Sequence, residues 1–401
     1  MLTSTLLPDL YGSPIMGYPS LEEHIETLRD KLQPTDGTDT EVDDDSIIRS
    51  IRREYKVSQN RQTKDNLDVK RRADELCWLR DMMANIPSSM IPRLVAHRGF
   101  HDPKDSSGKR PLENSLSACE TAWSNGIHLV EVDIALTADG QLVLAHDEDF
   151  QRLALHPSHT TSKTKVSDLT YREIIGLTTK SGSRPPLLLD VLRSAAAIGG
   201  DARLVIEVKP GNEESSSALV HLFSRHPSLI DRCAVIMSFD AYTMHKLKAG
   251  LNQLEESLKT ERDILHRTDS PNTVNDAKLP SFPSLRSIPL QIKMPDIMLL
   301  TVAQDPQKHY ELYVSVSDFS PVKSWLCHAD KPCLDGVYLQ YQPEMLHSGS
   351  NSLRSLSKQY QVGIWGYHGD PDDIITATRL VRDCGVSFVN TDLPRGFVKD
   401  N

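Results

Sequence analysis

The sequence predicts an α/β protein whose main domain is a TIM-type (β/α)8 barrel. From Arg93 onward, short runs rich in β-branched residues alternate with runs of helical spacing, which is typical of successive βα units and a parallel sheet. The chain has 401 residues, which is enough for one barrel of about 250 residues and a substantial further segment. Several strand-like runs end in charged residues, which a strand buried on both faces does not tolerate without compensation.

Nine segments have the composition of strands, and they are 93–99, 128–137, 141–147, 203–209, 234–240, 295–302, 335–341, 361–367 and 387–392. The second and third are joined by the turn Ala138-Asp139-Gly140, so we interpret this pair as one barrel strand followed by an excursion. That interpretation brings the number of strands close to the number in a barrel. Helices are expected in several of the connections, at 115–125, 170–177, 187–198 and 373–384.

The residues before the barrel lack this alternation. We interpret residues 1–92 as an N-terminal extension of helices and partly disordered linker, and residues 93–401 as the barrel domain. A helix is expected at about 66–84, either packed on the outer surface of the barrel or serving as an arm for a partner. Its apolar stripe would consist of Val69, Ala73, Leu76 and Met83. Prolines among polar residues indicate a long surface insertion, partly flexible, at about 250–290.

Composition narrows the classes of partner and compartment. The formal net charge is -10 and the isoelectric point is about 5.8, which argues against a nucleic-acid partner. The six cysteines are scattered and none forms a C-x-x-C pair, so we expect free thiols. We find no basic leader and no run of about 18 apolar residues, so we expect neither a signal peptide nor a transmembrane segment, and a cytoplasmic location. A peripheral membrane contact and the oligomeric state stay open.

Carboxylates on two of the predicted strands indicate a metal site. Glu131 and Asp133 are two residues apart, so they project from the same face of a strand, and Glu207 adds a third carboxylate from the next barrel strand. A buried carboxylate costs several kcal/mol unless a partner compensates it, and a metal ion is the simplest partner. Carboxylate oxygens with water suit a hard cation such as Mg²⁺ or Ca²⁺. No cluster of cysteine and histidine indicates structural zinc.

Two histidines and two cations follow other strand ends. His97 and His146 would flank the same cavity, and imidazole titrates in the range needed to give and take protons in phosphodiester cleavage. Arg98 and Lys209 would neutralise phosphoryl oxygens. Each of these residues alone is more often structural: a satisfied histidine, or a lysine beside a helix cap. Their joint occurrence at successive strand ends is what favours an active site.

The same residues carry a resemblance to a known family. The series H-R-G at 97–99, P-L-E-N at 111–114, the run E-V-D-I-A-L-T-A-D-G-Q-L-V-L-A-H-D at 131–147, and I-E-V-K-P at 206–210 resembles the signature of the glycerophosphodiester phosphodiesterases, and V-N-T-D-L-P at 389–394 matches their last strand. The resemblance covers roughly residues 93–395. It implies a barrel enzyme that uses a divalent metal to hydrolyse a small-molecule glycerophosphodiester to glycerol 3-phosphate and an alcohol.

The resemblance also implies roles for the charged residues. His97 and His146 correspond to the catalytic acid/base pair of the family. The corresponding metal ligands are Glu131, Asp133 and Glu207.

Five further positions correspond to residues that contact substrate or line the site. Arg98 and Lys209 match the contacts to the substrate phosphate. Glu113 and Asn114 belong to a motif that lines the site, although Asn114 fits equally well as the N-cap of the following helix. Trp365 lies where the family often has an aromatic residue near the glycerol, and a core aromatic is an equal alternative.

The sequence departs from the family pattern in three places, so the identity of the substrate is not determined. These places are the long polar loop from His101 to Arg110, the insertion at 250–290 and the N-terminal extension. One alternative function is a lysophospholipid or sphingolipid phosphodiesterase, similar to a phospholipase D, on the same barrel. A second is a non-catalytic binding protein that retains the barrel. The sequence also leaves open whether water attacks the phosphorus directly or opens a cyclic phosphate formed by the glycerol 2-hydroxyl.

Overall fold

The computed structural model describes residues 74–102, 110–209, 214–268, 292–302, 314–316, 318–366 and 371–394. They belong to one compact unit, which spans Arg72–Asn401. The part of the predicted extension before residue 74 lies outside the described residues, as does the part of the predicted insertion from 269 to 290. Among the described residues, no helix is both long and apolar enough to cross a membrane.

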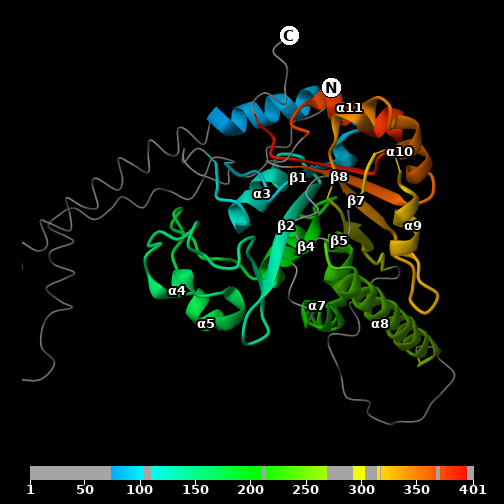
Figure 1. Cartoon of the computed structure of the whole chain (residues 1–401). Coiled ribbons are helices and arrows are strands. Elements are labelled where there is room, and N and C mark those ends of the chain that lie inside the picture. Colours follow the sequence, from blue (N-terminus) through cyan, green and yellow to red (C-terminus); the bar gives the residue numbers. More distant parts are fainter. Residues whose placement is uncertain are drawn as a thin grey trace, which may run out of the picture. The chain divides into compact units, whose positions relative to one another are not determined.

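Eight parallel strands close into a barrel around which the helices are arranged (Figure 1). They are β1 (Leu94–Ala96), β2 (Leu129–Leu136), β4 (Arg203–Val208), β5 (Cys233–Ser238), β6 (Asp296–Leu300), β7 (Gly336–Gln340), β8 (Gln361–Trp365) and β9 (Phe388–Thr391). The ring closes because β1 pairs with both β9 and β2. The ninth strand, β3 (Leu142–Leu144), pairs antiparallel with β2 outside the ring. The structure therefore confirms the barrel, and each predicted strand has its counterpart.

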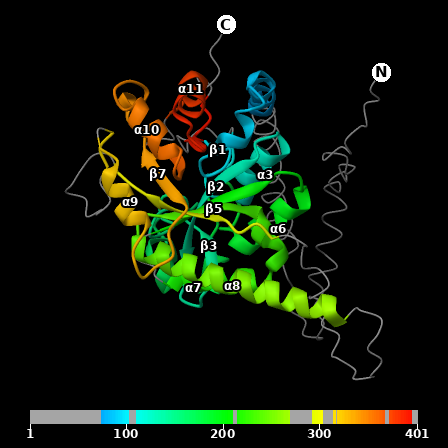
Figure 2. The same ribbon diagram turned by 90° about the vertical axis from the view of Figure 1, so that its right-hand side faces the viewer.

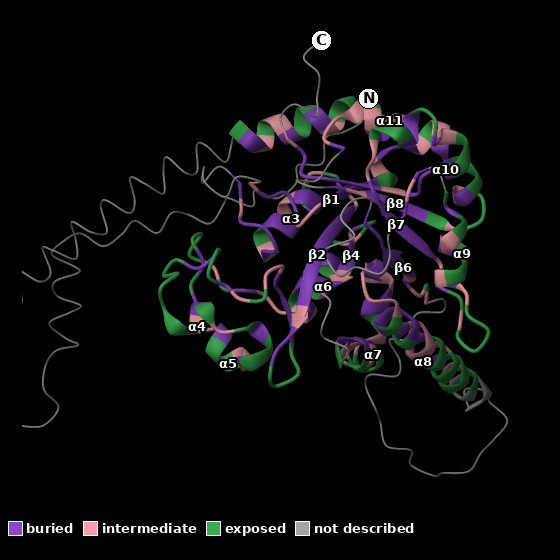
Figure 3. Ribbon diagram, in the orientation of Figure 1, coloured by how far each residue is buried: buried purple, intermediate pink, exposed green. Residues whose placement is uncertain are grey.

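The strands are buried on both faces (Figure 3). One set of residues fills the barrel interior and includes Val95, Leu129 and Val205. Their neighbours on the same strands, such as Leu94 and Leu204, pack outward in the core shared with the helices. Side chains alternate along a strand, so Glu131 and Asp133 lie on the inward face with Leu129, and Glu207 lies on that face with Val205.

The helices around the barrel are α3 (Leu116–Ser124), α6 (Leu188–Ile198), α7 (Glu214–Arg225), α8 (Ala241–Thr268), α9 (Ser320–Leu326), α10 (Ser350–Ser357) and α11 (Ile374–Cys384) (Figure 2). Short 3-10 turns precede or join several strands: η1 (Ile91–Arg93), η2 (Val166–Asp168), η3 (Pro227–Arg232) and η5 (Pro343–Leu346). The helices predicted at 115–125, 187–198 and 373–384 are present with bounds within a residue or two.

The excursion after β3 has a small core of its own. It contains the short helices α4 (Thr160–Lys163) and α5 (Tyr171–Ile174), the latter shorter than the predicted 170–177. Its buried residues form a cluster separate from those of the barrel and comprise Val143, Ala145, Phe150, Val166, Leu169, Ile174 and Leu177. The excursion is therefore held together largely by its own apolar contacts, beside the barrel rather than within it.

Two predictions about helices need correction. The predicted stripe of the helix before the barrel is displaced, because in the helical residues 74–85 the buried positions include Leu79 and Met82, whereas Leu76 and Met83 are only partly buried. Val69 and Ala73 lie outside the described residues. The segment predicted as a long, partly flexible surface insertion at about 250–290 is helical up to Thr268, because α8 continues into it. Its leucines are buried at helical spacing, and they are Leu247, Leu251, Leu254 and Leu258.

The prediction of free thiols is wrong for two of the six cysteines. Cys327 and Cys333 flank the connection between α9 and β7 and form a disulfide across a sequence separation of 6. The other four cysteines are free, and they are Cys77, Cys119, Cys233 and Cys384.

Candidate active site

The three predicted carboxylates meet at the barrel interior. One oxygen each of Glu131, Asp133 and Glu207 lies within 4.8 Å of the others. The strands bring them together because Asp133 on β2 is directly opposite Glu207 on the parallel strand β4. Both Glu131 and Asp133 are only 1% exposed. The structure thus assembles the predicted ligand set without any contribution from loops.

Asp133 is well compensated. Its Oδ1 accepts a hydrogen bond from Lys209 Nζ at 3.1 Å, and its Oδ2 accepts one from Asn114 Nδ2 at 2.8 Å. Burial acts to raise the pKa of Asp133, but the charges of Lys209 and Arg98 outweigh burial and hold it below its usual value. Lys209 also donates to Glu207 Oε1 at 2.7 Å, so one ammonium group serves two carboxylates.

Glu131 is not fully compensated. Its Oε2 accepts a hydrogen bond from the backbone N–H of Arg98 at 2.9 Å, but among the described residues its buried Oε1 has no hydrogen-bond partner. Burial, followed by the charges of Asp133 and Glu207, raises the pKa of Glu131 well above its usual value. A buried oxygen without a partner beside two other carboxylates is a position that a hard divalent cation would satisfy. The donor set therefore fits the predicted Mg²⁺ or Ca²⁺.

Each predicted histidine is paired with a carboxylate. His97, just after β1, has its Nδ1 2.6 Å from Asp392 Oδ1, and His146, after β3, has its Nδ1 2.7 Å from Asp147 Oδ1. The remaining nitrogen of His97, Nε2, lies 3.9 Å from Glu131 Oε2. Donation from Nδ1 to the carboxylate leaves Nε2 of each ring with a lone pair for proton transfer.

The loop after β1 holds Arg98 over the carboxylates. The backbone of Arg98 has a φ of 52°, in the left-handed region, which directs its N–H to Glu131. Its Nη1 donates to Glu113 Oε1 at 3.1 Å. Its Nε forms an ion pair with Asp133 Oδ2 at 3.3 Å and has no hydrogen-bond partner among the described residues. Arg98 therefore places a positive charge beside the carboxylates.

Asn114 belongs to the site and is not the N-cap of α3. Its φ is 50°, and its side chain both donates to Asp133 Oδ2 and accepts from the backbone N–H of Asp133 at 2.9 Å. The cap is the next residue, Ser115, whose Oγ accepts from the N–H of Ala118 at 3.2 Å. The N-cap interpretation of Asn114 is therefore wrong. Asn114 instead links the loop before α3 to the central strand of the site.

Gly99 allows the loop of Arg98 to approach α3, and its replacement is expected to be costly. Gly99 has a φ of 83°, and a Cβ there would lie 2.7 Å from Cβ of Ala118. We expect Gly99→Ala to lower the free energy of unfolding by about 3 kcal/mol, from left-handed strain and overpacking together.

Gly140→Ala is the matched control for this variant, because Gly140 has a φ of 75° with nothing within 4 Å. Its free energy of unfolding should fall by only about 1 kcal/mol, because the left-handed strain is present without the overpacking. Urea unfolding of both variants measures the difference, and equal losses would refute the steric contribution.

Arg152 is a site residue that the sequence analysis missed. Its Nη1 and Nη2 donate to the two oxygens of Glu113, at 2.9 and 2.5 Å, and its Nε donates to Asp147 Oδ2 at 2.7 Å. Burial acts to raise the pKa of Glu113, but the hydrogen bond from Arg152 and the charge of Arg98 outweigh it and lower that pKa. Arg152 therefore connects Glu113, which binds Arg98, to Asp147, which binds His146. The only signal in the sequence was its position six residues after His146.

Arg152→Lys tests this connection. Lysine keeps the charge but cannot donate to both oxygens of Glu113 and to Asp147 at once. We expect a fall in kcat of about tenfold to a hundredfold with a smaller change in KM, because His146 loses its fixed orientation. Arg193→Lys is the control, since Arg193 lies on α6 and forms an exposed ion pair with Asp190. Steady-state kinetics that leave kcat unchanged would show that Arg152 has no positioning role.

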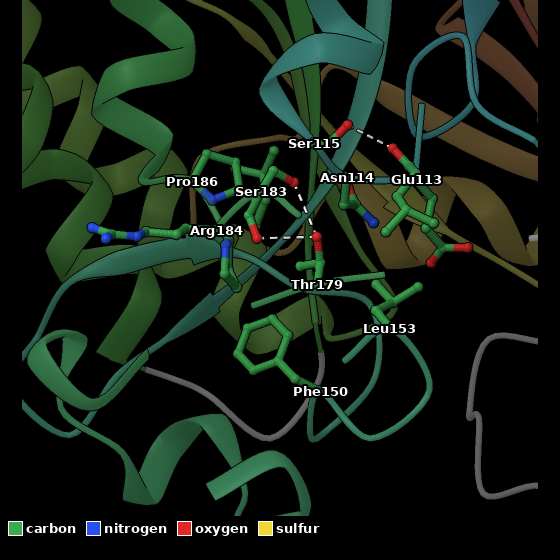
Figure 4. A pocket seen from close by; sticks show the side chains of 12 residues that line it. Glu113, Asn114, Ser115, Phe150, Leu153, Thr179, Ser183, Arg184 and Pro186 are labelled. Atoms are coloured by element: carbon green, nitrogen blue, oxygen red, sulfur yellow. Dashed lines mark hydrogen bonds between the residues drawn. The ribbon is translucent and has the colours of Figure 1, made fainter. Parts of the chain in front are cut away.

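A pocket lies beside Glu113 and Asn114, on the side of the excursion (Figure 4). Its walls combine apolar side chains, including Phe150 and Leu153, with the hydroxyl groups of Thr179 and Ser183. These hydroxyl groups hydrogen-bond to each other at 3.0 Å. The pocket therefore adjoins two residues predicted to line the site, Glu113 and Asn114, but none of the three clustered carboxylates lines it.

Trp365 lies at the C-terminal end of β8. Its Nε1 donates to the carbonyl oxygen of Thr301 at 3.0 Å, and its ring meets Phe239 edge to face with centroids 5.6 Å apart. It is partly buried and packs against the interior cluster of the barrel. This placement suits both alternatives, a wall for substrate and a core aromatic, so its predicted role stays a prediction.

The parallel barrel, its inward carboxylates and its carboxylate-paired histidines suit phosphodiester chemistry, and comparison with known proteins identifies the family. Residues 97–394 match the model of the glycerophosphoryl diester phosphodiesterase family, so the chain belongs to this family. It is 29% identical over 197 residues to human glycerophosphodiester phosphodiesterase 1, a match that covers 46% of this chain and 52% of the human protein. It is also 29% identical over 196 residues to a glycerophosphodiester phosphodiesterase of Bacillus altitudinis, covering 45% of this chain and 70% of that protein.

The fold agrees with a solved structure. A crystal structure from Galdieria sulphuraria, provisionally named as a glycerophosphodiester phosphodiesterase, superposes with a TM-score of 0.50 at 17% identity. The superposition covers 76% of this chain and 96% of that one. At this identity the similarity concerns the fold alone.

Proposed function

We propose that this chain hydrolyses glycerophosphodiesters to glycerol 3-phosphate and an alcohol, with a divalent cation, Mg²⁺ or Ca²⁺, held by Glu131, Asp133 and Glu207. The observation that carries the proposal is the buried Oε1 of Glu131, which has no hydrogen-bond partner among the described residues and adjoins two other carboxylates. The names of the human and bacterial relatives support the substrate class. The chain spans about half the length of the human relative, so the activity is proposed from shared residues rather than from the whole protein.

The bound cation would neutralise charge on the phosphoryl group and would lower the pKa of a bound hydroxyl or water. Arg98 and Lys209, whose charges lie beside the carboxylates, would neutralise phosphoryl oxygens. His97 and His146 would exchange protons with the attacking and leaving oxygens through Nε2, because a carboxylate holds Nδ1 of each ring. Glu113 and Asn114 would orient Arg98 and Asp133. Trp365 would contact the glycerol.

Release of glycerol 3-phosphate from glycerophosphocholine tests the proposal. We expect release with Mg²⁺ or Ca²⁺, loss of release with EDTA, and recovery when the metal is returned. Lysophosphatidylcholine and sphingomyelin, offered in parallel, test the alternative of a lipid phosphodiesterase. Cleavage of either lipid without cleavage of glycerophosphocholine would replace the proposed substrate, and turnover of none of the three would favour a non-catalytic barrel.

We also propose a cytoplasmic location, which the four free cysteines support and the Cys327–Cys333 disulfide does not. Cell fractionation tests it, and recovery of the protein in a secretory compartment would refute it.

A further inference from the structure

Arg110 is a buried cation that joins three separate segments of the chain. Its Nε donates to Glu75 Oε2 at 3.2 Å, and its Nη1 lies within hydrogen-bonding distance of the carbonyl oxygens of His101, at 3.3 Å, and Asp392, at 3.2 Å. Arg110 is 8% exposed and Glu75 is 4% exposed. Glu75 lies in the helical residues 74–85 before the barrel, which are drawn in blue in Figure 1. The contact therefore links that helix to the end of the last barrel strand.

Two aromatic rings hold the guanidinium group of Arg110 in place. Its central carbon lies 4.3 Å from the ring centroid of Phe100 and 5.0 Å from that of Trp78. The two rings are nearly parallel, with centroids 6.1 Å apart and an angle of 17° between their planes. An arginine combines such stacking with hydrogen bonds in several directions, which a lysine ammonium group cannot reproduce. The site is therefore built for an arginine.

The two carbonyl oxygens that Arg110 contacts belong to residues around His97. Asp392 holds Nδ1 of His97 through its own Oδ1 at 2.6 Å. His101 lies with its Nε2 4.0 Å from the same Oδ1, and its ring centroid is 6.1 Å from that of His97. Arg110 thus fixes the backbone on both sides of the His97–Asp392 pair without touching the carboxylate cluster itself.

We propose that Arg110, anchored by Glu75, is a positioning residue for His97, and that the helix at 74–85 is part of the catalytic unit rather than of a separable extension. This inference rests on the proposed role of His97 in catalysis. Glu75 sets the direction of the guanidinium group, and the two rings restrict its plane. The guanidinium group in turn holds the main-chain carbonyl of Asp392, which fixes the orientation of the Asp392 carboxylate. His97 then keeps Nε2 directed at the reacting phosphodiester.

Kinetics and proton NMR of Arg110→Lys and Glu75→Gln in the full chain test this proposal. The hydrogen-bonded Nδ1 proton of His97 should resonate at low field, and its disappearance in His97→Asn assigns it. We expect Arg110→Lys to lower kcat for glycerophosphocholine by about tenfold or more with little change in KM, and to shift or broaden this resonance. Glu75→Gln should act in the same direction with a smaller effect, because it keeps the arginine and its other partners.

Arg379→Lys is the matched control. Arg379 also donates to a main-chain carbonyl, that of Leu346 at 3.1 Å, and faces a carboxylate, that of Asp383 at 3.8 Å, but it lies on α11 away from His97. It should leave both kcat and the resonance as in the wild type. A resonance that is unchanged in both Arg110→Lys and Glu75→Gln would overturn the inference, as would equal losses of kcat in Arg110→Lys and Arg379→Lys.

The two readouts separate this inference from the proposed function. If the wild type does not cleave glycerophosphocholine, the proposed function fails, and the NMR signal still decides whether Arg110 orients His97. If Arg110→Lys does not fold, Glu75→Gln decides alone. In that case, an active wild type with a Glu75→Gln variant indistinguishable from it in kcat and in the resonance would limit Arg110 to a structural role and overturn its positioning role.

Discussion

Glu131→Gln is expected to weaken binding of a divalent cation by more than about a hundredfold and to stabilise the metal-free protein. The first effect follows because a direct ligand should matter more than the outer partners of a metal site, whose loss costs about tenfold to a hundredfold in affinity. The second follows because the variant removes a buried carboxyl group whose ionisation is opposed by burial and by the charges of Asp133 and Glu207, and whose Oε1 has no hydrogen-bond partner among the described residues. We expect a gain of about 1–3 kcal/mol in the free energy of unfolding with EDTA present.

Asp133→Asn is the informative counterpart of this variant. It should also weaken cation binding, but it should destabilise the metal-free protein by about 3 kcal/mol or more, because Lys209 and Arg98 lose the charge that compensates them. Calorimetric titration with Mn²⁺ and urea unfolding with EDTA measure the two effects. Glu148→Gln, at an exposed pair with Lys165, should change neither. Cation binding retained in Glu131→Gln would show that the carboxylate cluster is not the metal site.

His97→Asn and His146→Asn are each expected to lower kcat/KM for glycerophosphocholine by about 10² to 10⁴, the usual contribution of a positioned acid or base. Neither residue belongs to the carboxylate cluster, so both variants should still bind Mn²⁺. Retention of wild-type kcat/KM by either variant would remove that histidine from the proposed proton transfers.

A substrate with a better leaving group distinguishes the two histidines. Glycerophospho-p-nitrophenol releases a phenolate that needs no proton, so loss of the general acid should matter little for it, whereas loss of the base should matter as much as before. The variant that recovers on this substrate therefore lacks the acid. Recovery of both variants, or of neither, would contradict a division of labour between His97 and His146.

Local patterns made much of the site predictable. The carboxylates lie within strand-like runs and the histidines lie at the ends of others, and the two-residue repeat of a strand is enough to place Glu131 and Asp133 on one face. Burial of those strands on both faces made their polar residues stand out. The same reasoning predicted the barrel, since the excursion could be separated by a single turn at Gly140.

The partners of these residues were not predictable in this way. Asp392 is 295 residues from His97, and the contact exists only because β9 closes the ring against β1. Arg110 and Glu75 are 35 residues apart and meet through tertiary packing. The prediction of free thiols failed for a different reason. Two cysteines six residues apart in the sequence give no indication of whether the intervening turn brings them close enough for a disulfide. The helical spacing of the leucines in α8 is visible in the sequence, but the prolines that follow favoured the prediction of a partly flexible insertion from residue 250.

The separate core of the excursion has a consequence for how catalysis and folding depend on each other. His146 and Arg152 lie in a lobe with its own apolar cluster, whereas His97 and the three carboxylates belong to the ring. Such a lobe can open locally while the ring stays closed, since regions of a protein open with different free energies. Under the proposed function, changes in the lobe would alter which alcohols leave the site while preserving the three carboxylates and the barrel that carries them.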